Sequence, residues 1–544
     1  MELRPSTGHL PAGVDLEGFG RGGSLPAVWS RRWAGVADSP VLFDATPGGA
    51  GRWMTADELE DRSRRAAERL GQLGAVPGDR VLWSCRPSAA ALVVAVGVLR
   101  AGLVLVPFNP QATAREVAHV VSDVRPAVAV VDGADQRRWL LQAAVEPVAV
   151  TDPALTPAGG AVRRPGPRLP VAPALPGLDP AGPAVLDAPA PNAAALIGYT
   201  SGTTGAPKGA VLTHANLLAG TEALVAAWRW DASDRLVHTL PIFHAHGLCV
   251  GVFGTLLSGG SAVLLGRFDP VSVEEACRWH HASLFFGVPT MYHRLVDAPQ
   301  GRVLGRLRLA VSGSAPLAAD LHRRLSRQVG IDVLERYGMT ETLMTVSNPV
   351  EGERRPGTVG FPLPGVEVRL APAVAGGASS APAVAGGAST QPRGAAQILV
   401  RGPGVFAGYW DRPVANAEAF SDGWFYTGDL GAVDDAGYLR ILGRSTELII
   451  SGGFNVYPAE VEEVLAAHPA VAEVAVTGTP SDEWGEVVTA WVVPAVGSGD
   501  DALVADLVQH AATRLSAYKR PRLVRFVEEL PRTALGKVQR GALA

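Results

Sequence analysis

Short apolar segments alternate with amphipathic ones through the first part of this chain, and that alternation limits the folds open to it. Residues 55–73 place leucines near helical spacing, including Leu59 and Leu70, which predicts an amphipathic helix. Residues 80–83 and 127–131 have the length and apolar character of strands. Strands that alternate with helices predict an α/β fold with largely parallel sheets.

Composition excludes several classes of protein. The chain has 544 residues, 47% of them hydrophobic, so it can bury a large core and is too long for one ordinary domain. A formal net charge of -4 argues against nucleic-acid binding, which normally needs a basic surface. The 3 cysteines are scattered, which predicts neither disulfides nor a zinc site and favours a reducing, cytoplasmic setting.

One segment approaches the character of a membrane span. Residues 89–106 are almost entirely apolar, but Arg100 and Gly102 interrupt them. Each apolar piece is shorter than the roughly 20 residues that a helix needs to cross a bilayer. The N-terminus also lacks the basic start and apolar run of a signal peptide. We therefore expect a buried helix, a turn and a buried strand, with no integral membrane segment.

The chain changes character near residue 444, where a small α+β unit begins. Two strand-like segments are followed by a helical one at residues 502–515. About a hundred residues is an ordinary domain size. We expect a large domain over residues 1–444 and a small one over residues 445–544.

Two stretches are poor in periodic structure. Residues 151–191 are rich in Pro, Ala and Gly, which predicts a long surface loop. Residues 371–389 contain the segment APAVAGGAS twice. Such a segment is unable to build a packed core, which predicts a disordered insertion between two strands, and no function is assigned to it.

Residues 199–209, YTSGTTGAPKG, form the strongest local motif. Glycines let backbone N–H groups form an anion-binding concavity, hydroxyls add donors, and Lys208 adds a point charge. The spacing is not that of a Walker A loop. The alternative is a flexible turn, but the density of hydroxyls beside a lysine favours phosphate binding. The residues expected to bind ATP here are Thr200, Ser201, Gly202, Thr203, Thr204, Gly205 and Lys208.

This loop resembles the phosphate loop of the adenylate-forming, or AMP-binding, superfamily. The other motifs of that family follow in order: LPIFHAHG at 240–247, ERYGMTET at 335–342, WFYTGDL at 424–430, GYLRILGR at 437–444 and LPRTALGKVQR at 530–540. The resemblance spans roughly residues 40–540. It implies an acyl-CoA synthetase that uses ATP, Mg²⁺ and coenzyme A to activate a small carboxylic acid. It also implies stacked α/β subdomains with a β-barrel-like portion, and a small mobile C-terminal domain.

The same resemblance assigns roles to single residues. Lys537 would bond the substrate carboxylate and the α-phosphate, where negative charge gathers. Glu341 would be linked to the metal ion, because Mg²⁺ takes carboxylate and phosphate oxygens. Tyr337 would stack on adenine, and Asp429 would accept the ribose hydroxyls with help from Arg444. The full second set expected at ATP is Tyr337, Gly338, Met339, Thr340, Asp429 and Arg444.

The remaining implied roles concern coenzyme A and the hinge. His244 is expected to border the acyl pocket and gate the coenzyme A tunnel, whereas His246 is as consistent with a structural role. The C-terminal domain is expected to rotate and bring a glycine-containing segment to the site, namely Ser451, Gly452, Gly453 and Phe454. The family usually has Asp or Lys at the hinge position that Thr446 occupies, which puts the behaviour of the hinge in doubt.

The identity of the acid is less determined. Residues 285–295 and 311–317 resemble malonyl-CoA synthetases, in which an arginine at the place of Arg294 holds the distal carboxylate. The acyl-site residues expected from this resemblance are His244, Arg294, Ser312, Gly313 and Ser314. A buried arginine would select diacids strongly, whereas the alternative is a surface arginine on an amphipathic helix. Because SGGFNVYPAEVE is closer to general ligases, fatty or aromatic acids stay open.

Two other classes of function are possible. An adenylation enzyme that loads a carrier protein is one, although residues 444–451 lack the insertion expected of stand-alone acyl-AMP ligases. A nucleotide-binding relic without activity is the other, and the presence of Lys537, Glu341 and Asp429 argues against it. Oligomeric state is not determined by the sequence.

Overall fold

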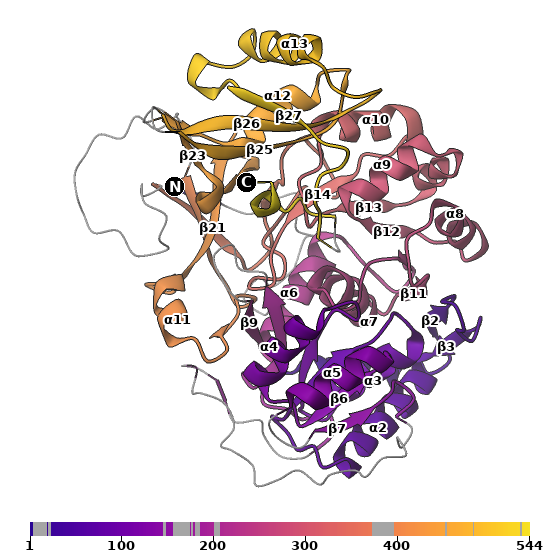
Figure 1. Cartoon of the computed structure of the whole chain (residues 1–544). Helices are drawn as coiled ribbons and strands as arrows, with labels where there is room; N and C mark the ends of the chain where they lie inside the picture. Colours follow the sequence, from indigo (N-terminus) through magenta and orange to yellow (C-terminus); the bar gives the residue numbers. More distant parts are fainter. Residues whose placement is uncertain are drawn as a thin grey trace.

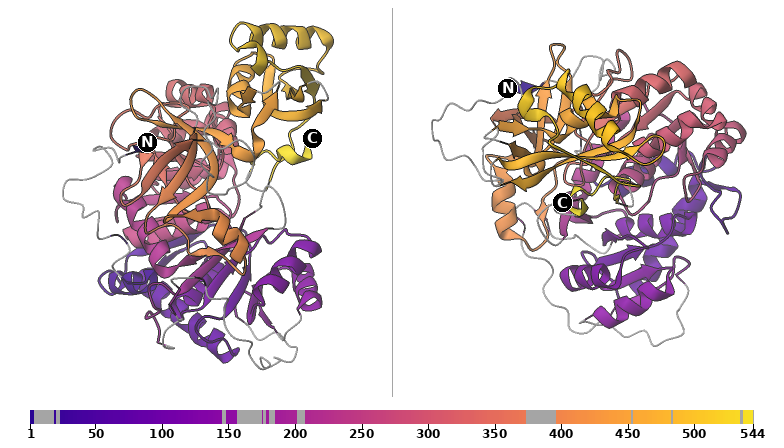
Figure 2. Two further views of the ribbon diagram at one scale, coloured as in Figure 1. Left: turned by 90° about the vertical axis from the view of Figure 1, so that its left-hand side faces the viewer. Right: turned by 45° about the horizontal axis from the view of Figure 1, so that its top comes forward.

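A computed structural model of the chain describes residues 1–3, 19, 23–144, 148–155, 175, 178–179, 185–200, 207–372, 396–451, 454–481, 484–533 and 536–543. These residues form four sheets. Three sheets build a large N-terminal part, and the fourth belongs to a smaller C-terminal part that lies over one end of it (Figures 1 and 2). The predicted division into a large and a small part is confirmed, and the predicted limit at residues 444 and 445 lies just before the fourth sheet.

The first sheet carries the strand that leads into the phosphate loop. Its order is β19 (Gly408–Tyr409), β9 (Lys208–Thr213), β8 (Ala194–Thr200), β5 (Val104–Pro107), β4 (Arg80–Ser84), β6 (Val128–Val131) and β7 (Ala149–Thr151). From β8 to β7 all neighbours are parallel, whereas β9 and β19 are antiparallel. The sheet is therefore mostly parallel, as the sequence predicts.

The second sheet is also parallel through its centre. Its order is β16 (Phe361–Pro362), β15 (Val346–Ser347), β14 (Leu334–Tyr337), β13 (Leu309–Ser312), β12 (Leu284–Gly287), β10 (Arg235–His238), β11 (Ser261–Leu264), β2 (Pro40–Asp44) and β3 (Trp53–Thr55). Only β16, β15 and β3 are antiparallel to their neighbours. The parallel strands consist mostly of apolar residues, because both faces of the sheet are buried.

The third sheet is antiparallel, and it is the sheet that we compare with the β-barrel-like portion implied by the resemblance. It consists of β1 (Glu2–Leu3), β17 (Glu367–Pro372), β18 (Ala396–Arg401), β21 (Trp424–Val433) and β20 (Phe420–Ser421), with β22 (Leu439–Arg444) also on β21. The pairings of the described residues leave it open from β1 to β20 rather than closed as a barrel. The repeat begins with the last two residues of β17, Ala371 and Pro372, and the rest of it lies outside the described residues.

Helices cover these sheets. In the large part they are α1 (Leu25–Trp33), α2 (Ala56–Gln72), α3 (Ala89–Arg100), α4 (Ala114–Val124), α5 (Ala134–Ala143), α6 (His214–Ala227), α7 (Gly254–Ser258), α8 (Pro270–Trp279), α9 (Pro289–Asp297), α10 (Ala319–Val329), α11 (Pro413–Ala419), the π-helix η2 (His246–Phe253) and the 3₁₀ helices η3 (Pro299–Arg306) and η4 (Ser445–Glu447). The predicted helix at 55–73 is α2, which Thr55 caps through a capping box with Glu58. The apolar segment at 89–106 is the buried helix α3 followed by β5, as predicted. No helix of the described residues has both the length and the apolar character needed to cross a bilayer.

The C-terminal part is a five-stranded sheet with two helices. Its elements are β23 (Ile449–Ser451), β24 (Phe454–Val456), α12 (Pro458–Ala466), β25 (Val471–Ser481), β26 (Gly485–Pro494), α13 (Asp501–Ala512), η5 (Ala517–Lys519), β27 (Leu523–Phe526) and η6 (Arg540–Ala542). The helix predicted at 502–515 is α13, displaced toward the N-terminus by one residue at its start and three at its end. Figure 2 shows this part as a separate lobe.

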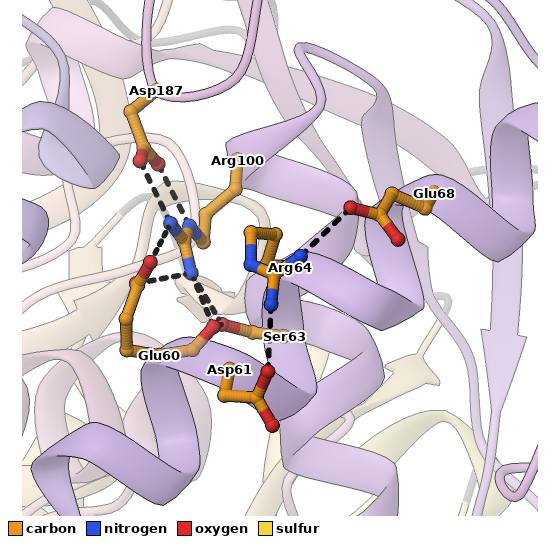
Figure 3. A network of polar contacts seen from close by, with 7 residues as sticks. All are labelled: Glu60, Asp61, Ser63, Arg64, Glu68, Arg100 and Asp187. Carbon is orange, nitrogen blue, oxygen red and sulfur yellow. Dashed lines mark hydrogen bonds and ion pairs between the residues drawn. The ribbon is translucent and has the colours of Figure 1, made fainter.

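Residues 151–191 are not purely a surface loop, and this part of the prediction is wrong for those of its residues that the structure describes. Leu175 is buried in an apolar cluster with Val211 and Trp410. Asp187 accepts two hydrogen bonds of 2.8 Å from Arg100, which is buried (Figure 3). A bidentate bond to a buried cation fixes this segment to α3, and composition alone gives no sign of it. Most of the stretch lies outside the described residues.

Candidate active site

Several of the expected functional residues lie where parallel strands of the large part end. The carboxyl ends of β10, β12, β13 and β14 are neighbours in the second sheet, and ligands of open α/β sheets bind at such edges. The strand β8 of the first sheet ends at Thr200, whose hydroxyl donates to the carbonyl of Lys208 at 3.4 Å. Six residues of the predicted phosphate loop, Ser201, Gly202, Thr203, Thr204, Gly205 and Ala206, lie outside the described residues.

A close approach joins the phosphate strand to the ERYGMTET motif. A Cβ added to Gly198 would lie 2.5 Å from Thr340 Cγ2. Only glycine gives this clearance, so β8 and Thr340 are in direct contact. Gly338 is equally confined, since its Cβ would lie 2.2 Å from the carbonyl oxygen of Leu343. The structure thus brings Thr340 and Glu341 to the base of the predicted phosphate loop, with Met339 packed against the main core.

Glu341 is a buried carboxylate beside this loop. Desolvation raises its pKa, while the hydroxyl of Tyr409 donates to its Oε1 at 3.0 Å and lowers the pKa. Arg444 lowers the pKa of Glu341 further and Asp429 raises it. No cluster of three or more potential metal ligands occurs among the described residues. Glu341 would offer a carboxylate to Mg²⁺, an ion that commonly takes one or two carboxylates together with phosphate oxygens and water.

A second polar group lies on the antiparallel sheet. Asp429 of β21 and Arg444 of β22 are cross-strand partners and form an ion pair of 2.8 Å. The hydroxyl of Tyr337, at the end of β14, donates to the other Asp429 oxygen at 2.5 Å. Burial raises the pKa of Tyr337 well above its usual range, so it remains a donor. The three residues predicted to hold adenine and ribose are therefore in contact.

Lys537 approaches this group from the C-terminal part. Its loop is fixed by a hydrogen bond of 2.8 Å from the Thr533 amide to the Lys537 carbonyl. The neighbouring Gly536 packs against the first turn of α9, since a Cβ added to it would be 3.1 Å from Thr290 Oγ1. Although Lys537 is accessible to solvent, desolvation by the surrounding protein lowers its pKa, and Arg444 lowers it further. The C-terminal part, which is the predicted lid, thus brings the predicted catalytic lysine close enough to Asp429 and Arg444 for their charges to act on its pKa.

The two histidines of FHAHG occupy different places. The backbone amide of His246 donates to His244 Nδ1 at 3.2 Å, which puts the His244 proton on Nε2. Burial, with a contribution from Arg336, lowers the pKa of His244 to about 4, so it is neutral at pH 7. His246 is buried, and its Nδ1 lies 3.1 Å from Ser314 Oγ, while its Nε2 has no partner among the described residues.

Arg336 is the residue that the sequence reasoning misses. It is buried, and its Nε and Nη2 have no hydrogen-bond partner in the described part of the chain. A Cβ on Gly313 would lie 2.2 Å from its Cζ, so the guanidinium packs on the Gly313 backbone beside Ser312, whose buried hydroxyl is also unpartnered. Desolvation lowers its pKa to about 9, which leaves it a cation at pH 7. The feature that could have drawn attention to Arg336 is the presence of an arginine within a strand, β14, that the fold buries.

Arg294 does not have the burial expected of it. It lies on α9 as predicted but is exposed, and its guanidinium stacks over Phe268 with Cζ 4.9 Å from the ring centroid. It lines a cavity of about 1210 Å³ that also contacts Met291, Thr290 and Gly536. The expectation of a buried arginine at this position is therefore wrong, because α9 presents this side chain to the open cavity instead of to the interior.

The predicted coenzyme A segment is not part of this arrangement. Ser451 is buried in β23 and pairs with Phe454 of β24, and neither lines the cavity. Phe454 stacks on Tyr518 with ring centroids 4.7 Å apart. Gly452 and Gly453 lie outside the described residues. Thr446 lies in η4, between the last strand of the large part and β23. A rotation of the lid remains a prediction.

Comparison with known families extends over most of the chain. The model of the AMP-binding enzyme family matches residues 29–410, and that of the AMP-binding enzyme C-terminal domain matches residues 460–537. A feruloyl-CoA synthase of Amycolatopsis sp is 36% identical over 500 residues, which cover 90% of this chain and 93% of that protein. A mitochondrial malonate–CoA ligase of Mus musculus is 40% identical over 377 residues, or 64% of each chain.

A solved structure supports the fold. The crystal structure of ATP-bound MatB from Rhodopseudomonas palustris has a TM-score of 0.80 and 37% identity with this chain. The match covers 96% of this chain and 98% of that one.

Proposed function

This chain belongs to the AMP-binding enzyme family and is an AMP-forming acid–CoA ligase, and from that premise we propose that its acid is a small dicarboxylate, malonate or methylmalonate. ATP would convert one carboxylate to an acyl-adenylate with loss of pyrophosphate. The thiol of coenzyme A would then displace AMP and form the thioester.

The observation that carries this proposal is that two guanidinium nitrogens of the buried Arg336, Nε and Nη2, have no hydrogen-bond partner among the described residues. A buried cation without a partner costs several kcal/mol unless an anion meets it. Its guanidinium packs on the backbone of Gly313. A monoacid has its only carboxylate at the reacting centre, whereas a diacid has a second one to offer. Relatives named malonate–CoA ligase and MatB support the same choice.

Arg294 would act as an outer cation for the same acid. It lines the open cavity rather than the interior, so water screens its charge more than that of Arg336. His244 is neutral and has its Nε2 hydrogen available as a donor beside the acid, and the hydroxyls of Ser312 and Ser314 are further donors. The proposed acid site therefore contains these residues together with Gly313.

The nucleotide half of the site would bind ATP through groups that are already in contact. Lys208 and the hydroxyls of the phosphate loop would meet the phosphates, and Asp429 with Arg444 would meet the ribose. Glu341 would hold Mg²⁺, which when bound neutralises phosphate charge during attack. Lys537 would bond the α-phosphate and the attacking carboxylate, where negative charge develops.

The proposed second step needs a change of lid position. The charges of Arg444 and Asp429 act on the pKa of Lys537, whereas Ser451 and Phe454 do not line the cavity. Rotation about the region near Thr446 would exchange them, which would commit each step to its own lid position. The relationship to a feruloyl-CoA synthase keeps an aromatic acid as the competing substrate class.

The test is thioester formation from a panel of acids. Purified protein is incubated with Mg-ATP, coenzyme A and malonate, methylmalonate, acetate, octanoate, palmitate, benzoate or ferulate, and products are measured by mass spectrometry. We expect kcat/KM for malonate or methylmalonate to exceed that for the monoacids by about a hundredfold, as a site with a buried unpaired group rejects substrates that leave it unpaired. A preference for ferulate or octanoate would contradict the dicarboxylate proposal and leave the ligase assignment intact.

A further inference from the structure

Tyr409 stands between the two charged groups proposed to meet the phosphates and the metal ion. Its hydroxyl donates to Glu341 Oε1 at 3.0 Å. On its other side, Lys208 Nζ lies 5.3 Å from the centroid of its ring. Lys208 and Glu341 form no ion pair with each other in the described part of the chain. One side chain therefore contacts both charges.

The backbone of Tyr409 is held in place from two directions. Tyr409 of β19 is the antiparallel partner of Ala210 in β9, two residues after Lys208. The side chain of Asn416 on α11 accepts from the Tyr409 amide at 2.6 Å and donates to its carbonyl at 3.0 Å. Because both backbone groups are bonded to one side chain, the ring has little freedom to move away from the site.

The residues that follow Tyr409 fix the start of the phosphate loop. Trp410 Nε1 donates to the Asp123 carbonyl at 3.2 Å, and Arg412 donates to the Asp123 carboxylate at 2.7 Å. The same carboxylate accepts from the hydroxyl of Tyr199 at 2.5 Å. Tyr199 precedes Thr200, so this segment supports the phosphate loop at its beginning while Tyr409 contacts Lys208 at its end.

The arrangement has a physical reason. A lysine and a glutamate in a poorly solvated site attract each other strongly, and a direct pair would neutralise the two charges that phosphate and a divalent cation require. The ring face attracts the ammonium by a cation–π interaction, which holds Lys208 without an anion. The hydroxyl fixes the orientation of the Glu341 carboxylate and occupies only one of its oxygens.

We propose that Tyr409 is a positioning residue of the nucleotide site, which orients Glu341 through one carboxylate oxygen, leaves the other oxygen for a divalent cation and keeps Lys208 apart from it for the phosphates. This role rests on the proposed binding of Mg-ATP by Lys208 and Glu341. Tyr409 makes no chemical step of its own. Its effect is on the geometry and charge of two groups before the nucleotide arrives.

The test is nucleotide binding by the full-length protein, measured by calorimetry with and without Mg²⁺. Tyr409→Phe keeps the ring and removes the hydroxyl, so we expect affinity for Mg-ATP to fall about tenfold, as for loss of a hydrogen bond to a charged group. Affinity for metal-free ATP should change less than about twofold, because the ring still holds Lys208. Tyr409→Leu, which also removes the ring, should weaken both.

A matched control separates positioning from folding. Tyr438→Phe also removes one hydroxyl, which donates to the Glu353 carbonyl at 2.9 Å away from Glu341, and should bind Mg-ATP as the wild type does. Equal losses for ATP with and without Mg²⁺, or wild-type binding of Mg-ATP by Tyr409→Phe, would overturn the role of Tyr409 alone. A wild-type protein that fails to bind Mg-ATP would overturn the proposed function and this role with it.

Discussion

Two buried arginines of this protein have opposite surroundings. Arg100, on α3, forms ion pairs with Asp187 at 2.8 Å and Glu60 at 2.5 Å and donates to Ser63 at 2.7 Å (Figure 3). Arg336, on β14, is packed against the Gly313 backbone, and its Nε and Nη2 have no hydrogen-bond partner among the described residues. The first cation is balanced by the chain itself. We propose that the second is balanced by a carboxylate of the acid.

This difference distinguishes a structural charge from a binding charge. Removal of a paired buried charge leaves its partners unsatisfied and destabilises the fold. Removal of an unpaired one relieves the fold and affects the ligand instead. Stability and activity should therefore respond to the two arginines in opposite ways, and each prediction below tests or refines that contrast.

The largest effect is expected at Arg336. Arg336→Met should lower kcat/KM for malonate by about a thousandfold, the scale of the ~3–5 kcal/mol lost when one partner of a buried charge pair is removed. Its unfolding free energy should stay equal or rise, because no internal partner is lost. Steady-state kinetics and denaturant unfolding measure the two. A destabilised variant with normal malonate activity would place Arg336 with Arg100 as a structural charge.

The converse is expected at Arg100. Arg100→Met leaves Asp187 and Glu60 without their cation and should lower the free energy of unfolding by about 3–5 kcal/mol, while kcat/KM of the folded protein stays near wild type. Arg64, on the same helix as Glu60, is the matched control. It is 44% exposed and pairs with Asp61 and Glu68, so Arg64→Met should cost less than about 1 kcal/mol.

Lys537 is an exposed charge of the C-terminal part, and its proposed role is in the adenylation step. Lys537→Ala should slow acid-dependent ATP–pyrophosphate exchange by about a hundredfold, as for loss of one donor to a developing charge. Desolvation lowers its pKa below 10.5. Its cation is therefore lost as pH rises through that lowered value, and the basic limb of kcat/KM should lie below pH 10.5. A rate that is unaffected by the substitution would remove Lys537 from the adenylation step.

The smallest effect is expected at Arg294. Because this arginine is exposed and stacked over Phe268, Arg294→Ala should lower kcat/KM for malonate only about three- to tenfold, with little change in stability. High salt should reduce the difference between variant and wild type, since exposed charges are screened. A loss as large as that of Arg336→Met, and insensitive to salt, would make Arg294 the principal anchor of the acid.

The sequence by itself determined much of this protein. Alternating apolar segments fix an α/β fold with mostly parallel sheets, because each strand must bury both faces under helices. Local spacing also fixes α2 and α3 at their predicted places. The order of the short motifs indicates Glu341, Asp429 and Lys537 as candidate site residues, because a motif can be recognised from its residue types and spacing without knowledge of the fold.

Only the tertiary structure decided which charges are paired. Arg294 and Arg336 both lie in motif segments, and the sequence favours Arg294 for the buried role. The structure exposes Arg294 on α9 and buries Arg336 beside Gly313. Likewise, the contact between Arg100 and Asp187 crosses a stretch with no periodic pattern. Burial and pairing depend on which elements pack over a side chain, and those elements are distant in sequence.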